Sequence, residues 1–176
     1  RIYSRLNKDL DNWKIAMTLY ATMRGIPQFY YGTELLFTNE KSGNDGQRRA
    51  DFYGGWAGDS KNAVTGKGLE PKELEAQKYL SNLLNWRKNA TVIHNGKFIH
   101  YAPEKNDVYV FFRYNVSAKV MVILNKNKDK VTLDISQYHQ MIPNTFNAKE
   151  IITNTEIAVN NFFDIFFKTA LILEIK

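Results

Sequence analysis

The sequence predicts an α/β-barrel remnant over residues 1–90, followed by an all-β antiparallel sandwich over residues 91–176. The first observation is the hydrophobic period, which changes from about 3.6 residues to about two after Lys97. The second is a helix pattern that runs into Gly25. It is followed by a nearly continuous apolar run, residues 26–31, in which residues 28–31 read as a strand closed by Gly32. A helix, a strand and then a long polar loop is the order of elements in an α/β barrel.

Two helices are expected in the first 90 residues. The first begins at a cap supplied by Asp11 or Asn12 and ends before Gly25. The second has Pro71 at its first position and closes with basic residues up to Lys88. Their apolar faces are Trp13, Ala16, Met17, Tyr20 and Met23 in the first helix, and Ala76, Tyr79, Leu80 and Leu83 in the second.

The loop after the predicted strand, residues 33–68, is much longer than the usual ~2–6 residues. In α/β barrels the chemistry lies in the loops that follow the strands. Gly54 and Gly55 stand beside Tyr53 and Trp56, so the backbone could approach a ligand while aromatic faces stack on it. On these residues alone, a packed surface loop is the favoured alternative.

Beyond Lys97, short runs with a period of two predict an antiparallel sandwich. The expected strands are residues 98–102, 108–114, 120–124, 131–134, 148–152, 156–159, 162–167 and 170–175. Turn chemistry separates them at residues 95–96, 105–107, 125–130 and 160–161. A helix of one or two turns is expected only at residues 136–140.

The composition excludes several classes of protein. The formal net charge is +6, but the basic residues are dispersed, and Lys126, Lys128 and Lys130 alternate with polar residues as in a solvated turn. We therefore expect no nucleic-acid partner. No apolar run approaches the ~18 residues of a membrane span, so we expect no membrane partner. The absence of cysteine excludes disulfides and thiolate metal sites.

Two motifs carry a resemblance to a known family. Residues 25–34 read G-I-P-Q-F-Y-Y-G-T-E, and Gly54-Gly55-Trp56 follows Asp51-Phe52. These runs resemble the eighth-strand signature and the D-F-P-G-G-W run of the alpha-amylase family (glycoside hydrolase family 13), in its neopullulanase and cyclomaltodextrinase branch. The resemblance implies a C-terminal fragment: residues 1–90 would hold the last two helices and last strand of a catalytic (β/α)8 TIM barrel, and residues 91–176 the β-sandwich that follows it.

The family's catalytic carboxylates are expected to lie outside this chain. The resemblance implies an Asp after the fourth strand, a Glu after the fifth and an Asp in an N-H-D motif after the seventh. Arg1-Ile2-Tyr3 looks like the residues just after that motif. We therefore expect no catalytic residue here, a structural role for Glu34, and no hydrolysis by this chain alone. His94, His100 and His139 share no metal-ligand spacing, so we expect no metal site.

The resemblance implies substrate binding instead. Amylase-like enzymes often carry an Asp, and an Arg four residues later, that hydrogen-bond sugar hydroxyls; Asp45 and Arg49 have this spacing. Trp56 and Tyr31 complete the expected substrate-binding set. Arg48 could take the role of Arg49, and Tyr53 stands where the D-F-P-G-G-W run of the family has Pro. The structural alternative is a surface ion pair between Asp45 and Arg49.

The expected function is that of a bacterial hydrolase of starch-type substrates. The parent would cleave α-1,4-glucosidic bonds in pullulan, cyclodextrins or malto-oligosaccharides by retaining double displacement. Its partners would be an α-glucan oligosaccharide or polysaccharide and the missing N-terminal part of its own barrel. We expect no cofactor within these residues, while the parent is compatible with calcium, and a periplasmic or extracellular rather than cytoplasmic location. The alternative is a non-catalytic carbohydrate-binding or structural β-sandwich module.

Overall fold

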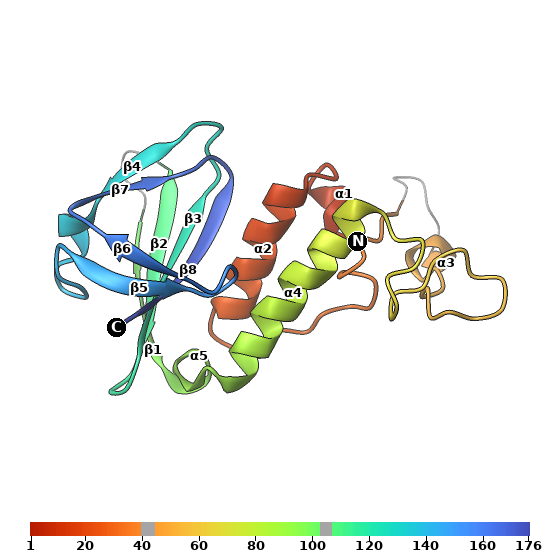
Figure 1. Cartoon of the computed structure of the whole chain (residues 1–176), viewed down its shortest axis with the longest axis horizontal. Helices are drawn as coiled ribbons and strands as arrows, with labels where there is room; N and C mark the ends of the chain where they lie inside the picture. Colours follow the sequence, from red (N-terminus) through yellow and green to blue (C-terminus); the bar gives the residue numbers. More distant parts are fainter. Residues whose placement is uncertain (40–44, 103–106) are drawn as a thin grey trace.

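The structure, a computed structural model, describes residues 1–39, 45–102 and 107–176. A pair of helices lies between a β-sheet domain on one side and a long loop region on the other (Figure 1). The helices are α1 (Ile2–Arg5), α2 (Leu10–Thr22), α3 (Asp45–Arg48), α4 (Pro71–Asn89) and α5 (Thr91–Asn95). The strands are β1 (Lys97–Tyr101), β2 (Val108–Tyr114), β3 (Lys119–Asn125), β4 (Val131–Asp134), β5 (Phe146–Glu150), β6 (Thr155–Val159), β7 (Phe162–Ile165) and β8 (Thr169–Ile175), with a 3-10 turn η1 (Ile135–Tyr138).

Both predicted long helices are present, as α2 and α4. The α2 cap is Asp9, whose carboxylate accepts a hydrogen bond from the Asn12 backbone N–H at 3.0 Å, so the prediction of Asp11 or Asn12 was wrong. Because the backbone of Asp9 is extended, its carboxylate can accept a hydrogen bond from an N–H group that has no partner within the first turn of the helix. The predicted apolar face also included Tyr20, which is 45% exposed. Pro71 is the first residue of α4, as predicted. Proline suits this position because the N–H that it lacks would have had no hydrogen-bond partner within the helix.

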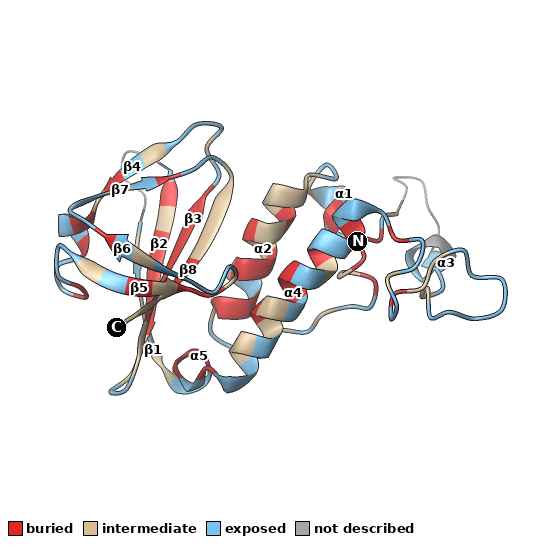
Figure 2. Ribbon diagram, in the orientation of Figure 1, coloured by how far each residue is buried: buried red, intermediate tan, exposed pale blue. Residues whose placement is uncertain are grey.

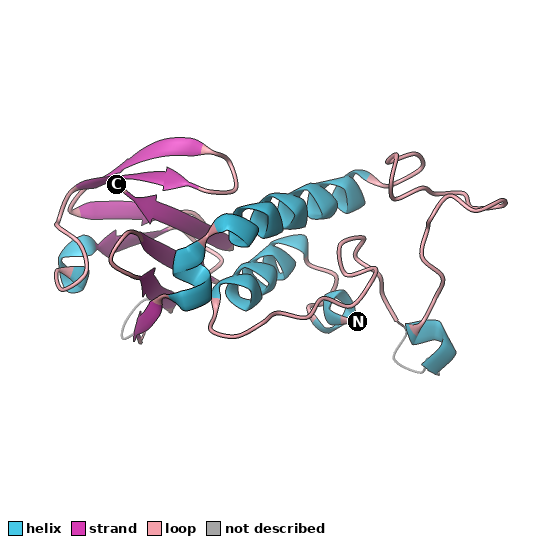
Figure 3. Cartoon of the chain, turned by 90° about the horizontal axis from the view of Figure 1, so that it is seen from below, coloured by secondary structure: helices cyan, strands magenta, loops and turns pink. Residues whose placement is uncertain are grey.

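The predicted strand at residues 28–31 is not formed. Residues 26–30 are a loop (Figure 3), and in the described part of the chain they pair with no strand. A barrel strand is held by ladder hydrogen bonds to neighbours on both sides, and no described segment supplies such a neighbour here. Within residues 1–39 and 45–90, the helical part thus contains two long helices but no barrel strand. Helices α1 and α5 are additional to the two helices that the sequence predicted.

All eight predicted strands are present, within about two residues at each end. They form a six-stranded sheet in the order β1-β2-β3-β8-β5-β6 and a two-stranded sheet of β4 and β7, all antiparallel. β5 ends at Glu150 rather than at residue 152, because the Glu150 carboxylate accepts hydrogen bonds from the Ile152 and Thr153 N–H groups and turns the chain. The predicted turn at residues 105–107 lies mostly outside the described residues.

The large sheet buries both of its faces. Alternate residues Phe111, Val122 and Ile172 pack against the helices, in one cluster with Trp13 and Leu83. The residues between them pack in a second cluster, against β4, β7 and η1; they include Phe112, Met121 and Leu173. Buried residues therefore occur in β2, β3 and β8 and in α2 and α4 (Figure 2).

Two charged side chains join the helices to the sheet. Arg113 on β2 is 1% exposed and donates hydrogen bonds to the carbonyl oxygens of Thr22 (3.0 Å), Ile93 (2.7 Å) and Gly96 (3.0 Å). Lys168, before β8, donates to the Asp9 carboxylate at the start of α2, and this hydrogen bond lowers the pKa of Asp9. No helix in the described residues is long and apolar enough to cross a membrane.

Candidate functional site

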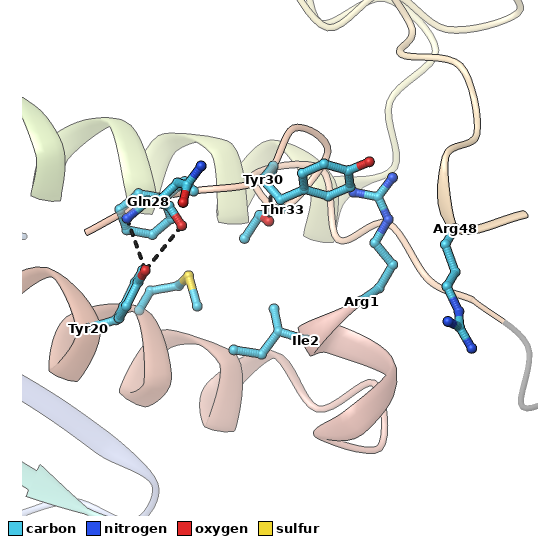
Figure 4. Close-up of a pocket in the computed structure, with 9 residues that line it drawn as sticks. Arg1, Ile2, Tyr20, Gln28, Tyr30, Thr33 and Arg48 are labelled. Carbon is cyan, nitrogen blue, oxygen red and sulfur yellow. Dashed lines mark hydrogen bonds between the residues drawn. The ribbon is translucent and has the colours of Figure 1, made fainter. Parts of the chain in front are cut away.

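A pocket of about 410 Å³ opens between α1, α2 and the segment that follows α2 (Figure 4). Its walls are apolar side chains interleaved with hydroxyl, amide and guanidinium groups. The lining residues are Arg1, Ile2, Met17, Tyr20, Gln28, Phe29, Tyr30, Thr33 and Arg48. This mixture suits a ligand with apolar faces and a hydrogen-bonding rim.

Tyr20 fixes one wall of the pocket. Its hydroxyl accepts a hydrogen bond from the Gln28 N–H at 2.9 Å and donates to the Gln28 carbonyl at 3.2 Å, as Figure 4 shows. Its ring meets that of Phe29 edge-on, with 5.2 Å between the centroids. These contacts replace the ladder hydrogen bonds that a strand would have made, and they hold residues 28–29 against α2.

Arg1 forms the opposite wall. Its guanidinium lies over the rings of Tyr30 and Tyr31, 4.6 and 4.8 Å from their centroids, and it donates to the Tyr31 carbonyl. Its Nε and Nη2 atoms are buried and have no hydrogen-bond partner among the described residues. Burial of such donors is costly unless an acceptor is supplied, so this wall favours a ligand or protein segment that carries oxygen acceptors.

The loop carries the acidic and basic residues that the sequence singled out. Asp45 begins α3 and pairs with Arg48 at 3.1 Å, and both side chains are largely exposed. Arg49 is exposed; its backbone N–H donates to the Gly46 carbonyl at 2.9 Å, but its side chain has no hydrogen bond or ion pair among the described residues. Arg48, not Arg49, lines the pocket beside Arg1. Asp45 therefore forms its surface ion pair with Arg48 and not with Arg49, the partner that the alternative named.

Trp56 lies on a loop whose conformation is held by hydrogen bonds between its own residues. The Asp59 carboxylate accepts from the N–H groups of Gly55 and Trp56 at 3.0 and 2.9 Å. Gly55 has φ of 88°, a conformation that favours glycine, and a Cβ there would lie 2.2 Å from Asn62 Nδ2, so another residue would be strained. The indole, 76% exposed, is therefore presented to solvent by a fixed backbone.

Lys61 and Glu73 tie this loop to α4. Lys61 Nζ lies 2.8 and 2.7 Å from the two Glu73 carboxylate oxygens, and one of them, Oε2, also accepts the Glu70 N–H at 2.7 Å. The hydrogen bond from Lys61 to Glu73 raises the pKa of Lys61. The pair thus joins the loop to the helix cap.

Lys61→Met should therefore lower the free energy of unfolding by ~1–2 kcal/mol, because it removes a charged hydrogen bond in a half-buried place. The amide of Ala63, bonded to the Tyr53 carbonyl at 2.8 Å, should exchange faster with solvent, as measured by NMR. Lys67→Met is the matched control, because Lys67 is exposed on the same loop. Equal effects of the two substitutions would contradict this role of the pair.

Comparison with known proteins shows which family the chain is similar to. Residues 98–174 match the cyclomaltodextrinase C-terminal domain family. The chain is 24% identical to a maltogenic alpha-amylase of Bacillus acidopullulyticus over 171 residues, which is 92% of this chain and 26% of that protein. It is 30% identical to a cyclomaltodextrin glucanotransferase of Klebsiella oxytoca over 150 residues, which is 84% of this chain and 21% of that protein. The chain belongs to the alpha-amylase family.

The fold agrees with this alpha-amylase-family assignment. The structure superposes on an alpha-amylase from Geobacillus thermoleovorans, solved with acarbose, with a TM-score of 0.67 and 18% identity, over 95% of this chain and 33% of that one. The chain spans about a quarter of the length of the curated relatives it matches. The predicted membership of the alpha-amylase family is thereby confirmed.

In this alpha-amylase-family chain, the predicted substrate-binding residues do not gather in one pocket. The pocket-lining residues of Figure 4 include none of Tyr31, Asp45, Arg49 and Trp56, although Tyr31 contacts the pocket residues Arg1 and Tyr30. Arg1 and Tyr20 line the pocket but were not predicted as site residues. The helical period of the sequence does not by itself show that Tyr20 is exposed on α2. No group of three or more His, Cys, Asp or Glu side chains within residues 1–39, 45–102 and 107–176 could hold a metal ion.

Proposed function

We propose that this chain is the C-terminal part of an alpha-amylase-family glycosidase. The protein would hydrolyse α-1,4-glucosidic bonds in pullulan, cyclodextrins or malto-oligosaccharides by retaining double displacement. The observation that carries this proposal is the similarity to a maltogenic alpha-amylase over 92% of the chain, which includes both the helical part and the sheet domain. Residues 1–90 would be the end of the catalytic barrel and residues 91–176 its C-terminal sandwich.

In this proposal the chain contributes substrate binding rather than chemistry. The nucleophile and the acid/base, two carboxyls about 5–5.5 Å apart, would come from parts of the barrel outside this chain. Asp45 and Arg49 would hydrogen-bond sugar hydroxyls, since a carboxylate only accepts and a guanidinium only donates. Trp56 would stack on a sugar ring. Their exposure leaves them open to a ligand, and the acarbose bound to the Geobacillus enzyme supports an α-glucan as that ligand.

The test uses the longer protein that contains this chain. Arg49→Ala should lower kcat/KM on malto-oligosaccharides roughly ten- to a hundred-fold, since a charged hydrogen bond is worth ~1.5–3 kcal/mol. Part of the loss can fall on kcat, because remote binding energy can serve the transition state. The melting temperature should hardly change, since Arg49 is exposed and unpaired among the described residues.

Arg48→Ala is the control. A larger kinetic loss from Arg48→Ala would transfer the role to Arg48, which lines the pocket and pairs with Asp45. A longer protein that binds but does not hydrolyse these glucans would overturn the glycosidase proposal and leave a carbohydrate-binding module.

A further inference from the structure

A second concave region lies on the other side of the helix pair, where α2 and α4 meet the sheet domain. It consists of two pockets of about 350 and 320 Å³ that share Lys14, Tyr79, Thr169 and Ala170 as lining residues. One extends to the turn after β5 and the other to the loop before β8. We call the two together the junction groove. It shares no lining residue with the pocket at Arg1.

The groove has an apolar floor and hydrogen-bonding walls. Tyr79, Ile152 and Leu171 supply apolar surface, and Asn82 and Thr153 supply amide and hydroxyl groups. The charged residues that line it are Lys14, Lys78, Lys168, Asp11, Glu75 and Glu150. These are three cations and three anions, so the groove has no net charge. An anionic polymer such as a nucleic acid would meet as many repelling as attracting charges. A neutral ligand rich in hydroxyls would find both donors and acceptors.

Two phenylalanines stand at one end of the groove. Phe166 and Phe167 are 67% and 56% exposed, although burial of such rings is the usual outcome. The buried Asn125 side chain donates to the Phe166 carbonyl at 2.7 Å, and the Lys168 N–H donates to the Asn127 carbonyl at 3.1 Å. The backbone that presents the two rings is therefore fixed, and adjacent aromatic faces can pack against the C–H faces of sugar rings.

We propose that the junction groove binds a linear neutral oligosaccharide, a second site separate from the loop that carries Asp45, Arg49 and Trp56. The choice of an α-glucan as that oligosaccharide rests on the proposed function. One or more glucose units would stack at Phe166 and Phe167, and the chain would continue along the apolar floor past Tyr79. Such a site would hold a polymeric substrate near the enzyme without taking part in bond cleavage.

The test is an NMR titration of the 176-residue chain with maltoheptaose. Backbone amides of residues 151–154 and 166–170 should shift on binding. The double variant Phe166→Ala/Phe167→Ala should bind about tenfold more weakly, the factor expected from loss of aromatic stacking. Phe162→Ala is the matched control, since Phe162 is also exposed, at 68%, but does not line the groove. Trp56→Ala should leave the shifts at the groove unchanged.

Three results would overturn the proposal: no shifts in the groove, equal weakening by Phe162→Ala and by the double variant, or loss of all binding in Trp56→Ala. An anionic oligogalacturonide that binds the groove more tightly than maltoheptaose would also contradict it. None of these results bears on hydrolysis by the longer protein, which is measured separately with Arg49→Ala. The two proposals can therefore fail independently.

Discussion

Arg113→Met should lower the free energy of unfolding by about 3 kcal/mol or more. The guanidinium satisfies three carbonyl oxygens, of Thr22, Ile93 and Gly96, at the ends of α2 and α5. Methionine keeps the apolar stem but leaves these carbonyls without their donor, and each buried unsatisfied group costs ~1–3 kcal/mol. For a chain of this size the melting temperature should fall by roughly 6–12 °C, which circular dichroism would measure.

Arg24→Met is the matched control, because Arg24 is an exposed arginine just beyond α2. Its effect should stay within about 0.5 kcal/mol. Arg113→Lys should be nearly as harmful as Arg113→Met, since a single ammonium cannot reach carbonyls that lie in different directions. A stable Arg113→Met variant would show that solvent or other donors can satisfy the helix ends, and that Arg113 does not join the two parts.

The 176-residue chain assayed alone should release no reducing sugar from pullulan, cyclodextrin or maltotriose. The loop carboxylates are engaged in other contacts: Asp45 pairs with Arg48, and Asp59 accepts the N–H groups of Gly55 and Trp56. Loss of a nucleophile or acid typically costs several orders of magnitude in rate. The longer protein, assayed under the same conditions, is the positive control.

If the chain alone turned over at the rate of an ordinary amylase, Asp45→Asn and Asp51→Asn would decide the cause. Loss of activity in either variant would place the chemistry in this loop and reject the view that the catalytic carboxylates lie elsewhere. Activity that survives both substitutions would point to a contaminating amylase, which a second purification step would remove.

The elements that could be predicted from sequence are those whose hydrophobic period extends over several residues. The strands were recognised because inward and outward residues alternate along them, and Pro71 marked the start of α4. Helices α1 and α5 have four and five residues, too few to show a helical period. The apolar run at residues 28–31 reads as a strand, but whether it forms one depends on neighbours that the run itself does not encode.

The candidate site was less predictable, because it depends on contacts between distant residues. Arg113 lies in an apolar run, and only the fold shows that three helix-end carbonyls meet there. Arg1 reaches Tyr30 and Tyr31 across about thirty residues of sequence. The choice between Arg48 and Arg49 was left open because the sequence of a loop does not show in which direction each side chain points. In the structure Arg48 lines the pocket.

The shared hydrophobic cluster has a consequence for the evolution of this architecture. One face of the large sheet, with Phe111, Val122 and Ile172, packs in one cluster with residues of α2, α4 and α5, which lie outside residues 98–174. The segment that matches the family is therefore not a portable unit, because transplanting it elsewhere would leave much of that face in water. Recombination at its border would succeed only with a host that offers an apolar helix pair of matching shape. A substitution that changes the shape of the sheet face must be compensated by a substitution in the helices that pack on it. We therefore expect the two parts to be inherited together.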